Sequence, residues 1–288
     1  MTTPQSLLFV FGLGYSALQL AERLKHAGWQ VAGTVRTPAK AVALEAQGIA
    51  AQVWAGEGPV DVPDGAHWLV TLPPDAQGCP AARAADDTAG RAASISYLST
   101  TGVYGDLNGG WAFEWSPVNP GSARAQARVT AESQWLTASG GRARIVRLPG
   151  IYGPGRSPFD RLREGTAQRV ILPGQVFSRV HVDDIASGLA ALLARPEAKG
   201  VFHLCDDLPA PPQDVTAHAA TLLGLPVPPD VAIEDAGLSD MALSFYAECK
   251  RVANGRAKAA LGWQPRYPTY REGLAAILDA EGGNLSGT

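Results

Sequence analysis

The sequence has few cysteines, no long apolar run and no block of basic residues. Cys79, Cys205 and Cys249 are far apart and form no Cys-x-x-Cys pair, which argues against a disulfide framework or a zinc site. No run reaches the roughly 18 apolar residues of a membrane helix, and no basic start precedes a signal-type core. The formal net charge is −3. We therefore expect a cytoplasmic protein with reduced thiols, no metal, and neither membrane nor nucleic acid as partner.

The first organised stretch is an apolar run that ends in glycines and continues as an amphipathic helix. Residues 7–11 are apolar, Gly12-Leu13-Gly14 follows, and apolar positions then recur at helical spacing. Gly12 permits a tight turn, and Gly14 lets the backbone approach a pyrophosphate that the helix start can bind. Ala17 stands where the third glycine of this motif needs only a small residue. The stretch predicts a dinucleotide site.

A missing acidic residue bears on which dinucleotide binds. NAD sites place Asp or Glu about 20 residues after the glycines, but no acidic residue lies between Glu22 and Glu45. Thr34, Arg36 and Thr37 stand there instead. A guanidinium, hydroxyls and a helix start suit a 2′-phosphate, so we favour NADP over NAD. Alternatively, Arg36 is a solvated residue at a strand end, and cofactor choice stays open.

Strand-like runs alternate with helical stretches along the chain. This alternation predicts an α/β fold with a doubly wound parallel sheet of the Rossmann type. The expected strands cover residues 7–11, 29–35, 50–54, 67–72, 94–98, 143–148 and 201–204.

Three further segments carry a family resemblance. They are LSTTGVYG (98–105), RLPGIYGPG (147–155) and RVHVDDIA (179–186). With the glycine turn, they resemble the extended short-chain dehydrogenase/reductase superfamily of the NAD(P)-dependent epimerase/dehydratase type. The resemblance covers nearly the whole chain and implies a Rossmann core over 1–155 and a small C-terminal substrate lobe. Residues 156–175 and 206–270 would form the cap, and 176–205 and about 271–281 would return to the core.

The chain departs from this family at the positions of the family's catalytic residues. The family uses a Ser or Thr hydroxyl and a Tyr-x-x-x-Lys pair, and Thr100 matches the hydroxyl. Counting back from Glu132, the family's glutamate, puts Arg128 at the lysine and Arg124 at the tyrosine; no tyrosine lies between Gly105 and Gly150. An arginine stays protonated near neutral pH and cannot act as general acid or base. The chain thus resembles the superfamily's atypical branch.

Other groups could replace the missing acid. Tyr104 or a water molecule could serve, and Tyr152 is a second phenol, although both phenols fit structural roles as well. His181 titrates in a useful range, or it packs against the sheet edge beside a helix cap formed by the following aspartates. Arg156, Arg161 and Arg163 could meet an anionic substrate or form a solvated helix face.

Two functions follow from this pattern. The chain is an NADP(H)-dependent oxidoreductase or epimerase acting on a small polar substrate, or it is an inactive NADP(H) sensor. The resemblance also implies a possible homodimer. The expected catalytic residues are Thr100, Tyr104 and Arg128, and the expected cofactor-binding residues are Gly12, Leu13, Gly14, Tyr15, Ser16, Thr34, Arg36, Thr37, Leu72, Pro73, Pro149 and Ile151.

Overall fold

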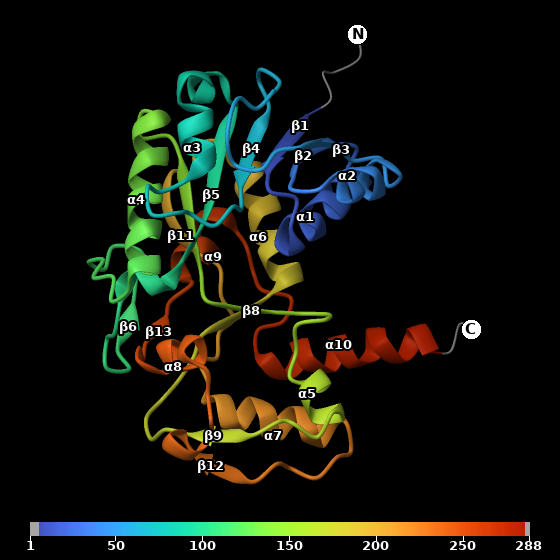
Figure 1. Ribbon diagram of the computed structural model, residues 1–288, viewed down its shortest axis with the longest axis vertical. Helices are drawn as coiled ribbons and strands as arrows, with labels where there is room; N and C mark the ends of the chain where they lie inside the picture. Colours follow the sequence, from blue (N-terminus) through green and yellow to red (C-terminus); the bar gives the residue numbers. More distant parts are fainter. Residues whose placement is uncertain (1–5, 286–288) are drawn as a thin grey trace.

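A seven-stranded parallel sheet lies at the centre of the structure, a computed structural model that describes residues 6–285. The strand order is β11-β7-β5-β4-β1-β2-β3 (Figure 1). The order reverses between β1 and β4, and ligands of such sheets bind outside the carboxyl ends of the strands at this reversal. The strands are β1 (Leu7–Phe11), β2 (Gln30–Val35), β3 (Ala50–Val53), β4 (His67–Val70), β5 (Ser94–Thr100), β7 (Arg144–Leu148) and β11 (Gly200–His203).

Helices cover both faces of this sheet. Along β1, Leu8 and Val10 pack into one hydrophobic cluster, and Phe9 and Phe11 pack into the other. Burial on both faces explains why the strand is a continuous apolar run rather than an alternating one. The first cluster includes α1 (Tyr15–His26), α2 (Pro38–Glu45), α6 (Val182–Leu193) and α9 (Gly255–Leu261), and the second includes α3 (Pro80–Ala84), η1 (Asp86–Arg91) and α4 (Ala123–Ala138).

A smaller lobe lies beyond the carboxyl ends of the strands, below the sheet in Figure 1. Its hydrophobic cluster joins Tyr152, Phe159 and Leu162 to two helices. Three short parallel pairs, β8 with β10, β9 with β12 and β6 with β13, connect distant parts of the chain. The elements outside the central sheet and its covering helices are η2 (Thr101–Tyr104), β6 (Trp111–Ala112), β8 (Gly150–Tyr152), α5 (Phe159–Arg163), β9 (Arg169–Ile171), β10 (Arg179–His181), α7 (Pro212–Leu222), β12 (Asp230–Ala232), η3 (Ile233–Asp235), α8 (Asp240–Tyr246), β13 (Arg251–Val252) and α10 (Tyr270–Leu285).

The doubly wound Rossmann-type fold expected from the sequence is confirmed. Strand β5 continues to Thr100, two residues beyond its predicted end. Leu274 and Ile277 of α10 pack in the cluster of the lobe with α7, whereas residues from about 271 to 281 were expected to return to the core. Within residues 6–285, no helix combines the length and apolarity needed to cross a membrane.

Candidate functional site

The glycine turn after β1 is held by the neighbouring strand. The Gly12 amide donates to Thr34 Oγ1 at 2.9 Å, and the Leu13 amide donates to the Thr34 carbonyl at 2.9 Å. Gly12 has φ +95°, and a Cβ there would lie 2.8 Å from Leu72 Cδ2. A side chain at this position would therefore be strained and would clash. Thr34 is buried and shapes the turn.

The start of α1 is open, as an anion site requires. Gly14 occupies the N-cap, and no side chain caps the first turn that begins with Tyr15 and Ser16. A Cβ on Gly14 would meet nothing closer than the Gly12 carbonyl at 3.8 Å. The uncapped amides of the first turn lack intrahelical partners and favour negative charge. The residues present here fit a dinucleotide pyrophosphate.

The end of β2 presents free polar groups beside this turn. Arg36, Thr37 and Lys40 are exposed. Thr37 is the N-cap of α2, but its hydroxyl makes no capping hydrogen bond. Within residues 6–285, Arg36 forms no ion pair with a carboxylate. The guanidinium and the hydroxyl are thus both available to a phosphate.

Arg128 is fastened to the carboxyl ends of β4 and β5. Its Nη1 donates to the Leu98 carbonyl at 2.9 Å, to Tyr97 Oη at 3.0 Å and to the Leu72 carbonyl at 3.5 Å. Thr100, at the end of β5, accepts a hydrogen bond from the Gly102 amide at 3.1 Å. Arg128 and Thr100 therefore both lie near the carboxyl end of β5.

The remaining expected cofactor contacts come from two loops at the same sheet edge. Leu72 and Pro73 follow β4, and Leu72 packs against Gly12. Pro149 links β7 to β8, where Ile151 pairs with Val180 of β10. Both loops follow strands that lie on the same side of β1, opposite β2.

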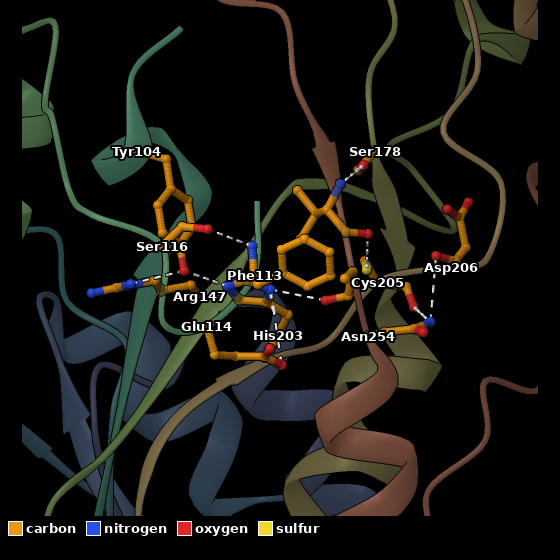
Figure 2. Close-up of polar contacts among 12 residues, drawn as sticks. Tyr104, Phe113, Glu114, Ser116, Arg147, Ser178, His203, Cys205, Asp206 and Asn254 are labelled. Atoms are coloured by element: carbon orange, nitrogen blue, oxygen red, sulfur yellow. Dashed lines mark hydrogen bonds and ion pairs between the residues drawn. The ribbon is translucent and has the colours of Figure 1, made fainter. Parts of the chain in front are cut away.

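Tyr104 does not face this edge. It is fully buried, and its hydroxyl lies 2.6 Å from His203 Nε2 and accepts a hydrogen bond from Arg147 Nη1 at 2.8 Å (Figure 2). His203 Nδ1 lies 2.9 Å from the Ala253 carbonyl, so Nδ1 carries the proton and Nε2 accepts from Tyr104. Both hydrogen-bonding capacities of the phenol are used inside the protein. The predicted role of Tyr104 as a substitute proton donor does not fit this position.

The network around Tyr104 continues through Arg147, which the sequence analysis assigned no role. Arg147 Nη2 lies 2.6 Å from Glu132 Oε2, and Ser99 Oγ donates to Glu132 Oε1 at 2.5 Å. All three residues are buried. The charge of Glu132 thus compensates the buried guanidinium, as a buried ion pair requires. Its partners lie 15 and 33 positions away, so spacing alone could not reveal the network.

Two of the alternative candidates have structural roles. His181 is buried, and its Nδ1 accepts the Asp183 amide at 3.2 Å at the start of α6. Tyr152 packs edge-on to the His181 ring, 5.1 Å away. Asp184 accepts the amides of Arg266 and Tyr267 at 2.6 and 3.1 Å. The histidine itself caps α6, whereas the sequence analysis expected an aspartate to do so.

Two of the three arginines after β8, Arg156 and Arg163, have side-chain partners of their own. The Arg156 guanidinium lies over the Tyr15 ring, 4.4 Å from its centre, and Tyr15 Oη donates to the Pro154 carbonyl at 3.0 Å. Arg163 pairs with Glu281 at 2.5 Å. Arg156 therefore fixes the loop after β8 to the start of α1, and Arg163 belongs to a surface ion pair.

Asp206, just beyond β11, is a buried carboxyl that the sequence analysis did not single out. It is 2 % exposed, and neither side-chain oxygen has a hydrogen-bond partner among the described residues. Its amide donates to the Arg179 carbonyl at 2.8 Å. Burial raises the pKa of Asp206 to about 7, although the charge of Arg179 acts in the opposite direction.

Three similar proteins place this site in context. A functionally unknown conserved protein from Silicibacter pomeroyi DSS is 46% identical to this chain, with a TM-score of 0.89. The match covers 96% of this chain and 100% of that protein. The human epimerase family protein SDR39U1 with NADPH has 15% identity and a TM-score of 0.74, covering 95% of this chain and 99% of its own. A 3-diazoavenalumate denitrifying reductase from a Streptomyces species is 38% identical over 170 residues.

These matches differ in extent. The match to the reductase spans about half of each protein, 54% of this chain and 54% of the reductase. The sequence similarity to the Silicibacter pomeroyi protein extends over the full length of that protein, whereas the human protein is similar in fold. No protein family profile matches the chain.

Proposed function

We propose that this chain, which shares its fold with the human epimerase family protein SDR39U1 and part of its sequence with a reductase, is an atypical member of the extended short-chain dehydrogenase/reductase superfamily and an NADP(H)-dependent oxidoreductase acting on a small polar substrate. The observation that carries the choice of cofactor is the unpaired Arg36 guanidinium at the end of β2. The turn at Gly12 and the open start of α1 would hold the pyrophosphate. Arg36 and Thr37 would hold the 2′-phosphate.

The nicotinamide, when bound, supplies a hydride at the carboxyl edge of the sheet. At this edge the chain offers the Thr100 hydroxyl and Arg128, which can orient a substrate and hold ribose hydroxyls. Neither Arg124 nor Arg128 can release a proton near neutral pH. Tyr104 is enclosed, so a proton, where one is needed, would come from water.

With arginines in place of the family's acid and Tyr104 enclosed, the site favours substrates that accept a hydride without a proton. A carbonyl becomes an alkoxide on hydride addition and needs a proton, whereas an iminium or diazonium cation is neutralised by the hydride itself. A relative named for denitrification of a diazo compound fits the second class. We propose that this chain reduces strongly electrophilic substrates in preference to simple carbonyls.

The cofactor assignment predicts a selective loss in Arg36→Ala. Removing one charged hydrogen-bond donor to a phosphate typically weakens binding about tenfold or more. The Kd for NADPH, measured by cofactor fluorescence, should rise by that factor, whereas the Kd for NADH should not change. Arg23→Ala is the matched control, because it removes a different exposed arginine, which lies on α1. Equal loss of NADPH and NADH affinity would contradict a 2′-phosphate contact.

Turnover separates the enzyme from the sensor. NADPH consumption is followed with an aldehyde, an iminium and an aryl diazonium salt, each corrected for its reaction without protein. We expect catalysed consumption with the cations and a much lower rate with the aldehyde. Tight NADPH binding without turnover of any of them would favour the NADP(H) sensor.

A further inference from the structure

We infer that Arg124, over Phe245 of α8, is a binding site for the carboxylate of a planar, conjugated substrate. This inference rests on the proposed function, because it places the substrate at the same edge of the sheet. Arg124 lies one helical turn before Arg128 on the same face of α4. Arg128 is bound to the ends of β4 and β5, so Arg124 stands one turn farther out, toward the lobe.

The two arginines form a positive pair without a carboxylate. Within residues 6–285 neither takes part in an ion pair. The first turn of α4 has no acidic residue. Like charges four positions apart repel each other, and the amino end of a helix disfavours cations. A bound anion would relieve both effects.

Phe245 determines how the guanidinium is presented. The Arg124 Cζ lies over the Phe245 ring, 5.1 Å from its centre. The aromatic ring thus holds the guanidinium, whose planar fork of N–H groups can bind a carboxylate through two hydrogen bonds. A carboxylate at this site would therefore meet a guanidinium already positioned by Phe245.

The apolar surface of α8 indicates what the anion is attached to. No residue of α8 is buried, and Met241 and Phe245, one turn apart, are 65% and 53% exposed. In Figure 1, α8 lies beside β13, on the side of the lobe that faces the sheet. A flat conjugated scaffold joined to a carboxylate would cover this apolar strip while its charge meets Arg124.

Cinnamate and its neutral amide, cinnamamide, test the carboxylate site. Each is titrated calorimetrically into the NADPH-saturated protein. We expect cinnamate to bind at least about tenfold more tightly than cinnamamide, because a charge-assisted bidentate contact is lost in the amide. Arg124→Gln should abolish that preference, and Arg124→Lys should retain part of it. Phe245→Leu should weaken the binding of both ligands.

Arg23→Gln, the same charge change on an exposed arginine of α1, should leave the preference intact. Equal binding of the acid and the amide, binding of neither, or equal losses in Arg124→Gln and Arg23→Gln would overturn the inference. Failure of NADPH to bind would contradict the proposed function alone, because cinnamate can still be titrated into the cofactor-free protein.

Discussion

At the scale of single residues, two buried hydrogen bonds hold the Tyr104 hydroxyl inside the protein, away from the site. The hydroxyl satisfies His203 Nε2 and Arg147 Nη1 together. Desolvation by burial raises the pKa of Tyr104, and the Arg147 charge opposes that rise. The phenol therefore stays neutral near pH 7 and donates a structural hydrogen bond.

Tyr104→Phe should lower stability without removing the cofactor site. Leaving a buried acceptor and a charged donor unpaired costs about 1–3 kcal/mol, measurable by urea unfolding. Tyr15→Phe, which loses an exposed hydrogen bond to the Pro154 carbonyl, should cost less than about 1 kcal/mol. A loss of turnover in Tyr104→Phe with unchanged unfolding free energy would instead point to a role in catalysis.

Local sequence could indicate only features that depend on the chain nearby. Gly12 and the open helix start follow from one short motif, and Thr100 was singled out by the family resemblance of the segment 98–105. The environment of Tyr104 depends on His203, 99 positions later in the chain. No periodicity or short motif carries a contact of that kind, so the sequence left Tyr104 open as a proton donor.

At the scale of elements, the long periodic segments were predictable and the short pairs were not. The main strands follow from apolar patterns within each segment. Strands β6 and β13 are only two residues long and exist because Trp111 and Ala112 pair with Arg251 and Val252. Their conformation is imposed by tertiary pairing rather than by local preference.

The packing of α10 predicts different effects at two of its glycines. A Cβ on Gly273 would lie 2.0 Å from Tyr152 Oη, whereas a Cβ on Gly282 would meet nothing within 4 Å. Gly273→Ala should therefore destabilise by about 1–3 kcal/mol through overpacking. Gly282→Ala should be neutral or stabilising by up to about 1 kcal/mol through helix propensity. Thermal unfolding of the two variants compares them directly, and equal effects would contradict this packing.

At the scale of the whole molecule, stability should depend on pH through Asp206, which lies where the chain leaves the sheet for the lobe. Its pKa is about 7 in the folded protein, against about 3.9 in an unfolded chain. The folded state therefore binds more protons between these values, so this carboxyl lowers stability as pH rises from about 4 to about 7. Arg179, Asp207, Tyr152 and Cys205 are charged or titratable groups that interact with it.

Asp206→Asn should flatten that dependence. The unfolding free energy of the variant minus that of the wild type should be greater at about pH 8 than at about pH 5, by more than about 1 kcal/mol. Urea unfolding at the two pH values measures the difference. Asp61→Asn, at an exposed carboxyl, should run parallel to the wild type. A parallel profile for Asp206→Asn would show that Asp206 titrates normally.

The chain crosses between the sheet and the lobe several times, after β7, before α6, after β11 and through β13. This path limits how the protein can be engineered. Chimeras that exchange a substrate lobe between relatives usually need one splice at a hinge, but here a transplanted lobe would have to be rejoined at each crossing. New specificity would therefore be introduced more easily by local grafts, such as a replacement of α8, than by exchange of the whole lobe.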